Sequence, residues 1–436
     1  GGGEQGPSVA SGAQAATAAA PAIAEDLLAQ MPEGGARLDP GETIARLRAH
    51  RAAKAGAETL SPDEAQSRAA EDEAEVQRIR ESHRHMAHLQ PAPPQATSFR
   101  SAKWRRRLDR ARDGAKQFAG ANLSGVNLSD MDLRGYDLSH ANLESANLTG
   151  ARLDGANLSG AVLARATLEQ ATFVNARLDG ASLAKAQCRR CDFTGASMDG
   201  TNCQAAVFDE AVFRQARFRA NELRDSQWRS CDLRESHWSN LVFWKVRIEH
   251  LRFDAAQIKQ VIWIECAFGQ AALVGARLGS CGFITADASA GVDFSSASLE
   301  ACSFAHGTSM PGAIFQLARL KQCGLRTTRL EGADFTGACL ENCDFSECDL
   351  TRARLDGLIG GESLFVRTNL TAASLKGADL IDASLAKADL RFANLEQANL
   401  YRADVSQALI DATTLLAGAY TQHAKLWPKR REEAGA

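Results

Sequence analysis

An apolar residue recurs at every fifth position of this chain, and few backbones accept that spacing. From Phe118 to Phe283 the series runs through 34 consecutive positions. The chain is 45% hydrophobic, so chance would give such a run roughly once in 10^12 trials, and the spacing marks a true internal repeat. A second column of small residues lies two positions earlier and is unbroken from Ala141 to Ala186.

A five-residue period excludes a helix and a simple strand. On a helix it would spread the apolar residues around the whole circumference. In an extended segment, Ala141 and Leu143 point to one side and Asn142 to the other. Because five is odd, each unit must turn a corner after about three extended residues, often at Ser-Gly, Asp-Gly or Thr-Gly. Regular corners coil the chain into a solenoid whose small and leucine columns point inward.

The repeat shifts its register twice. It moves by one residue after Phe283 and resumes at Phe294. It moves again, resumes at Phe315, and then holds every fifth residue to Leu415 except at Gly360. We therefore expect short insertions within an otherwise continuous solenoid.

Several units read A(D/N)LXX: Ala378-Asp379-Leu380, Ala388-Asp389-Leu390 and Ala398-Asn399-Leu400. Residues 116–417 therefore resemble the pentapeptide-repeat family. The resemblance implies an all-β fold, a right-handed quadrilateral parallel β-helix with four units in each square coil. About fifteen coils would form a rod ~70 Å long, at ~4.8 Å per coil.

The remaining segments suggest four regions. We expect residues 1–100 to be a flexible linker with helical segments at 22–31, 42–55 and from Ser61 to about His88, where PAPP follows. Residues 101–116 predict a helical cap with Trp104, Leu108 and Ala111 on one face, because an open solenoid end must be covered. The β-helix would span 117–417, and 418–436 would form a C-terminal cap and tail. The chain begins without methionine, so we expect it to be the C-terminal part of a longer protein.

The 11 cysteines do not follow the spacing of a disulfide or zinc framework. All except Cys339 fall in the two inward columns, which predicts buried small hydrophobes. Free thiols favour a reducing cytoplasm. No stretch approaches 18 consecutive apolar residues, so we expect no membrane span.

We expect no catalytic residue, cofactor or metal. His83, His85 and His88 lie close together, but a solvated helix face explains them better than a metal site. Arg105–Arg107 and Lys429–Arg431 are basic triplets that could meet phosphate, but ordinary solvated termini explain them better. No nucleophile with a base and no phosphate-binding loop appears.

The charge of the repeat region argues against DNA mimicry. Members of the family that act on DNA gyrase present a strongly negative, duplex-like rod, and ~70 Å of duplex carries about forty charges. Residues 116–418 sum to only −5, with basic residues interspersed. The best local acidic cluster is Glu341, Asp344, Glu347 and Asp349.

One zone, residues 238–268, departs from the pattern. Large residues replace alanine in the inward columns, and apolar residues appear at outward positions. With twenty residues per coil, the following side chains would stack on one face: Val242, Trp244, Ile262, Ile264 and Ile284. An exposed apolar stripe usually marks a partner site. The alternative is that the segment 284–291 folds over this stripe as a loop.

These features predict a non-enzymatic scaffold or adaptor that holds partner proteins along a rigid face. The long irregular array, the Trp/Phe-rich middle and the Ala/Pro-rich start also resemble the accessory proteins of type VI secretion clusters. That resemblance implies an effector or spike protein as partner. The alternative function is regulation of DNA gyrase by DNA mimicry; we expect nucleic acid itself not to be a partner.

Overall fold

The computed structural model describes residues 43–46, 49, 62–112, 114–288 and 291–427, and the chain divides into two compact units, Gly1–Pro91 and Ala92–Ala436. In the first unit residues 43–46 are helical, α3 spans Pro62–Met86 and the 3-10 turn η1 spans Ala87–Leu89. Predicted helix 22–31 and Ser61 lie outside the described residues. The predicted solvated face is wrong for His83 and His88, which are both buried. His83 lies seven residues, about two turns, after Val76 on the same side of α3, which is therefore a buried face, whereas His88 lies in η1.

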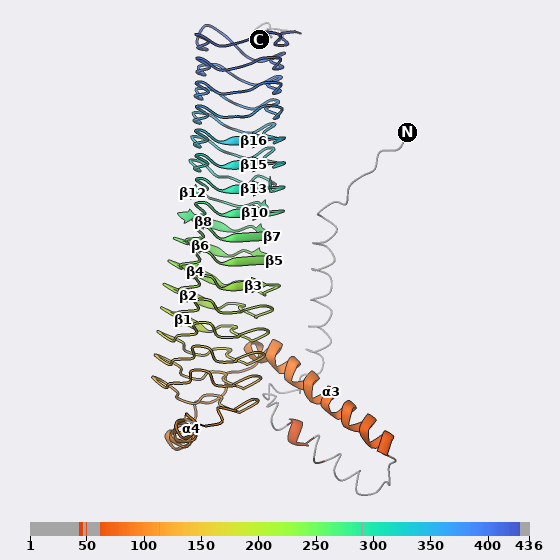
Figure 1. Cartoon of the computed structure of the whole chain (residues 1–436), viewed down its shortest axis with the longest axis vertical. Helices are drawn as coiled ribbons and strands as arrows, with labels where there is room; N and C mark the ends of the chain where they lie inside the picture. The colour runs from red at the N-terminus through yellow and green to blue at the C-terminus, as the bar shows by residue number, and fades with distance from the viewer. Residues whose placement is uncertain (1–42, 47–48, 50–61, 113, 289–290, 428–436) are drawn as a thin grey trace. The chain divides into compact units, whose positions relative to one another are not determined.

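The second unit opens with helix α4, Ser98–Arg110. The Thr97 hydroxyl accepts a hydrogen bond from the Arg100 N–H at 3.2 Å, which satisfies one free donor of the first turn. Leu108 is fully buried, Trp104 and Ala111 pack beside it, and the Tyr136 hydroxyl donates to the Leu108 carbonyl at 2.7 Å. The face predicted from sequence therefore lies against the first coils (Figure 1).

The rest of the unit is a parallel β-solenoid, as the five-residue period predicted (Figure 1). Pairing partners lie 20 residues apart in regular coils, which corresponds to four five-residue units per turn. One ladder of parallel pairings runs the length of the stack through Gln117, Asp137, Asn157, Arg177, Ser197, Arg217, His237, Gln257, Arg277, Ser298, Arg319, Cys339, Ile359, Asp379, Asn399 and Tyr420.

Most sides of a coil pair with the next coil through a single bridge residue. Where two or more consecutive residues pair, the side is a short strand. Those in the described residues are β1 Gln187–Arg189, β2 Val207–Asp209, β3 Arg217–Arg219, β4 Gln227–Arg229, β5 His237–Trp244, β6 Arg247–Glu249, β7 Gln257–Ile264, β8 Ala267–Gly269, β9 Ala271–Ala272, β10 Arg277–Gly279, β11 Gly282–Ile284, β12 Val292–Asp293, β13 Ser298–Glu300, β14 Ser303–Ala305, β15 Arg319–Lys321 and β16 Cys339–Glu341.

Most five-residue units end in the same corner. In the unit Ala151–Gly155, Ala151 and Leu153 are fully buried and Arg152 is exposed. The N–H of Ala156 donates to the Leu153 carbonyl at 3.0 Å, and Gly155 has a φ of 65°. A turn with a left-handed third residue favours glycine, which explains the recurring Asp-Gly and Ser-Gly pairs.

The outward residue stabilises the corner, which explains why it is so often Asn or Asp. The Asn147 side-chain oxygen accepts a hydrogen bond from the Thr149 N–H at 3.0 Å. Asp344 and Asp404 do the same for Ser346 and Ser406, at 2.8 and 2.9 Å. These are Asx turns, in which the side chain satisfies a backbone donor two residues ahead.

The insertions lie close to their predicted places, and a further one occurs near the end. Ala271 pairs with Val292, 21 residues on, after the first shift. Asn394 pairs with Leu415, again 21 residues on. The predicted inward position of Leu415 is therefore wrong: Leu415 is 49% exposed, Thr414 takes the small inward position after Ala393, and Leu416 takes the leucine position after Leu395. The extra residue lies in the turn around Asp411, where Thr413 and Thr414 hydrogen-bond to Asp411.

The expected C-terminal cap is instead part of the last coil. Tyr420 pairs with Asn399 and Lys425 with Asp404, so the ladder continues through 419–425. Tyr420, Leu426 and Trp427 are all exposed. Within the described residues, no helix is long and apolar enough to cross a membrane.

Candidate functional site

The five apolar residues singled out in the sequence lie together on one face of three successive coils. They are contributed by β5, β7 and β11. Val242 pairs with Ile262, Trp244 pairs with Ile264, and Ile264 pairs with Ile284. We call this set (Val242, Trp244, Ile262, Ile264 and Ile284) the apolar stripe.

The apolar stripe is open at its first coil. Val242 is 41% exposed and Trp244 is 39% exposed, whereas the three isoleucines are half-buried against their neighbours in the ladder. The Arg224 guanidinium of the preceding coil lies 5.5 Å from the centre of the Trp244 ring, a cation–π contact. The stripe thus offers a contiguous apolar surface with a positive charge beside it.

The described residues after the stripe do not cover it. Ala286 and Ala288 occupy inward positions and are buried, and Asp287 pairs with Ala267 and Ser309. Residues 284–288 therefore follow the coil path instead of leaving it as a loop. Residues 289–290 lie outside the described part of the chain.

The interior beneath the stripe is filled with aromatic rings. Trp263 stacks between Phe243 and Phe283, with ring centroids 5.9 and 4.6 Å away, and Trp238 stacks on Phe218 at 3.9 Å. These large rings, with Leu241 and other aliphatic residues in the small column, are all buried. The stacked rings fill the interior of the coils that carry the apolar stripe and stabilise those coils.

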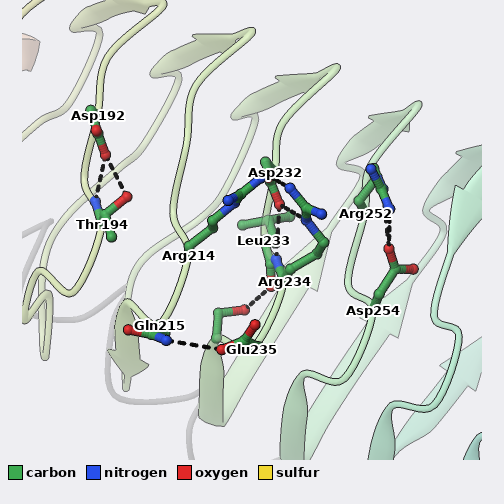
Figure 2. A network of polar contacts seen from close by, with 11 residues as sticks. Asp192, Thr194, Arg214, Gln215, Asp232, Leu233, Arg234, Glu235, Arg252 and Asp254 are labelled. Carbon is green, nitrogen blue, oxygen red and sulfur yellow. Dashed lines mark hydrogen bonds and ion pairs between the residues drawn. The ribbon is translucent and has the colours of Figure 1, made fainter.

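Opposite charges on the outer surface form ion pairs within a coil and between adjacent coils. Figure 2 shows Asp232 between Arg214 and Arg234, each 2.6 Å from its Oδ2, and Arg252 paired with Asp254 at 2.7 Å. In the predicted acidic cluster, Glu347 is paired as well, because it lies 2.9 Å from Arg326 and 3.5 Å from Arg367. This pattern differs from the uninterrupted negative charge of a duplex.

Two arginines of the basic triplet Arg105–Arg107 contact neighbouring groups of the protein. Arg105 donates to the Ser129 carbonyl at 2.8 Å, and the Arg107 guanidinium lies 4.9 Å from the Trp104 ring. The second triplet, Lys429–Arg431, lies outside the described residues. Among the described residues there is no group of three or more His, Cys, Asp or Glu side chains that could hold a metal ion.

Asp132 joins helix α4 to the first coils through ion pairs. Hydrogen bonds from the Arg134 guanidinium, and then from Arg112, hold the pKa of Asp132 well below its usual range. Arg112 follows the end of α4 and lies 2.6 Å from the Asp132 carboxylate. The charged form of Asp132 therefore contributes to the attachment of the cap.

We expect this contribution to be lost in acid. It is present above the pKa of an unfolded aspartate, about 3.9, and disappears as the pH falls from there toward the lower pKa of the folded carboxyl. Asp132→Asn should cost about 1 kcal/mol at pH 7, measured by thermal unfolding, and should raise hydrogen exchange in α4. Asp109→Asn, at an exposed position of α4, is the control. An unchanged midpoint for Asp132→Asn at pH 7 would contradict this role.

Comparisons with known proteins agree with the repeat. Residues 117–155, 328–358 and 363–408 match the family described as pentapeptide repeats (8 copies). Residues 166–241 match the family described as pentapeptide repeat region. The search of curated proteins found no match.

Solved structures of the same repeat type are similar to parts of the chain. A pentapeptide repeat protein from Nostoc PCC 7120 is 33% identical over 26% of this chain and 83% of its own, with a TM-score of 0.15. HetL from Nostoc sp. strain PCC 7120, involved in heterocyst differentiation regulation, is 21% identical over 73% and 92%, with a TM-score of 0.12. QnrB1, a plasmid-mediated fluoroquinolone resistance protein, is 20% identical over 42% and 91%, with a TM-score of 0.24.

Proposed function

The chain belongs to the pentapeptide-repeat family, and from that premise we propose that it is a non-enzymatic adaptor that binds a partner protein on the apolar stripe. The observation that supports this most directly is that Val242 and Trp244 are exposed next to the half-buried Ile262, Ile264 and Ile284, so the five side chains form one contiguous surface. Exposed apolar side chains also occur elsewhere on the solenoid, for example Leu317 and Phe392. A rigid solenoid exposes a long regular surface, which suits it to hold partners at a fixed place.

The chemistry of the stripe defines the partner that fits it. Trp244 would be the anchor, since buried tryptophans dominate the energetics of many interfaces. Arg224 and Lys245 flank it, and Lys245 lies 3.4 Å from Glu265. We therefore expect a partner segment with apolar side chains and at least one carboxylate. In the finer form of this proposal, the partner is an effector or spike protein of a type VI secretion system and the site of action is the cytoplasm.

Regulation of a topoisomerase by DNA mimicry is the alternative function. It requires a continuous negative face, whereas many of the described carboxylates are paired with arginines. Ion pairs such as Arg190 with Glu210, 2.7 Å apart, join successive coils and weaken the negative electrostatic potential at the surface. We therefore favour the adaptor.

The experiment is binding of purified candidate partners, first the spike and effector proteins and then gyrase, to matched variants. Trp244→Glu/Ile264→Glu places two carboxylates on the stripe in adjacent coils. Val366→Glu/Ala386→Glu places two carboxylates at the same register of the same face, further along the rod. We expect the first variant to lose at least tenfold in affinity for the partner, about 1.4 kcal/mol, and the second to bind as the wild type does.

Circular dichroism and thermal unfolding establish that both variants keep the solenoid. Equal binding of a spike or effector protein by both variants would remove the stripe from the proposal. Gyrase bound by all three proteins, with spike and effector proteins bound by none, would replace the adaptor with the alternative.

A further inference from the structure

Four cysteines occupy the same inward position in four successive coils. They are Cys281, Cys302, Cys323 and Cys343, and we call them the thiol column. The residues that follow them pair in register: Gly282 with Ser303, Ser303 with Gly324, and Gly324 with Asp344. Each cysteine is at most 2% exposed. Nothing in the binding proposal above uses these side chains.

The four side chains point the same way. Each thiol lies against a backbone carbonyl of the preceding coil: Cys281 against Ile258 at 3.5 Å, Cys302 against Leu278 at 3.7 Å, Cys323 against Leu299 at 3.4 Å and Cys343 against Leu320 at 3.3 Å. Each is also near the carbonyl two residues before it, at 3.4 to 3.6 Å. Because orientation and register repeat, the sulfur atoms repeat at the coil spacing of ~4.8 Å.

That spacing selects one kind of ligand. A metal–thiolate bond is about 2.3 Å long, so two such bonds in a line span about 4.6 Å and fit the column with little movement. A disulfide needs sulfurs about 2.05 Å apart, so both side chains would have to turn away from their carbonyls. A tetrahedral ion needs four ligands around one point, whereas these sulfurs lie in a row.

We propose that the thiol column binds Cu(I), a soft ion that thiolate ligands select, with one ion between Cys281 and Cys302 and one between Cys323 and Cys343. Each ion is held by two thiolates in a line. Two thiol protons leave for the solvent as each ion enters, so binding strengthens as the pH rises. Entry to the buried column requires a local opening of the coils.

Buried cysteines outside the column provide the matched control. Cys231 and Cys266 have the same kind of contact, with the carbonyls of Phe208 and Phe243 at 3.5 and 3.4 Å. Their partners in the adjacent coils are Ala211 and Leu251, and Val246 and Ala286, so neither has a second thiol one coil away. Burial raises the pKa of Cys231 and Cys266, and the pKa of Cys302 and Cys343 is raised as well, so the controls differ from the column in lacking a neighbouring thiol.

The test titrates the reduced full chain, under anaerobic conditions, into Cu(I) held as its coloured bicinchoninate complex. The excess bicinchoninate keeps single thiols from taking Cu(I). The loss of colour of the complex gives the number of ions transferred to the protein. Compared with the wild type, we expect one ion fewer for Cys302→Ala, two fewer for Cys302→Ala/Cys323→Ala, and the same number for Cys231→Ala/Cys266→Ala. Alanine occupies the same inward column at Ala161, Ala181 and Ala383, so the variants should fold, which circular dichroism establishes.

The result that identifies the thiol column as the site is the stepwise loss of bound copper from the wild type to the single and then the double column variant. The double variant leaves Cys281 and Cys343 three coils apart, too far for one ion to bridge. The proposal is overturned if the wild type takes no copper from the complex, or if all four proteins take the same amount. A loss in Cys231→Ala/Cys266→Ala that equals the loss in the column variants also overturns it.

Discussion

Ala156→Asp should unfold the coils around it. Ala156 is 1% exposed and occupies the small inward column of the solenoid, between Tyr136 and Ala176 in the neighbouring coils. An aspartate there buries a carboxylate without a partner, at a cost of several kcal/mol. Because each coil is stabilised by its neighbours, the damage should spread along the stack. Denaturant unfolding and hydrogen exchange of residues 136–176 measure it.

The control must point outward and add no new repulsion. Asn157, the next residue, is unsuitable because its amide donates to Asp137 at 3.1 Å, and a carboxylate there would face another carboxylate. Asn147 stacks between Asn127 and Thr167, and its oxygen accepts from Thr149 as an aspartate would. Asn147→Asp should therefore change the free energy of unfolding by less than about 0.5 kcal/mol. Equal losses in the two variants would show that the register is wrong.

The solenoid could be predicted because its physics is local and repeated. Most five-residue units place one small and one large apolar residue inward. The spacing of columns such as Leu143 to Leu183 is therefore enough to predict the solenoid. The apolar stripe could be placed for the same reason, since twenty residues per coil fix which side chains become neighbours. Its role in binding stays a proposal.

Features set by non-repeating contacts were not predictable. Ile410 and Leu415 continue the five-residue spacing, and only the extra residue near Asp411 moves the leucine-column position from Leu415 to Leu416. The burial of His83 and His88 has no signal in a polar helix sequence. The thiol column was visible as inward cysteines, but its order depends on counting the inserted residues correctly, because Cys281 and Cys302 are 21 positions apart rather than 20.

The start of the solenoid depends on a glycine for two separate reasons. Gly125 has a φ of 66°, and its carbonyl accepts the N–H of Ala96 at 2.9 Å. A Cβ at this position would lie 2.6 Å from the Pro94 carbonyl oxygen. Gly125→Ala should therefore strain the corner and also push away the segment that leads into α4. We expect a loss of about 1 kcal/mol from the backbone and at least about 1 kcal/mol more from the lost hydrogen bond.

Gly155→Ala separates the two effects. Gly155 has a φ of 65°, and a Cβ there would meet nothing within 4 Å, so this variant should show only the backbone cost. If Gly125→Ala displaces the cap, the first coil exposes unpaired strand edges, and end-to-end association should follow. Analytical ultracentrifugation should then detect dimers for Gly125→Ala and not for Gly155→Ala. Equal stability and equal mass for the two variants would mean that the contact with Pro94 does not fix the cap, and that Arg105, Arg112 and Leu108 hold it without help from the segment before the helix.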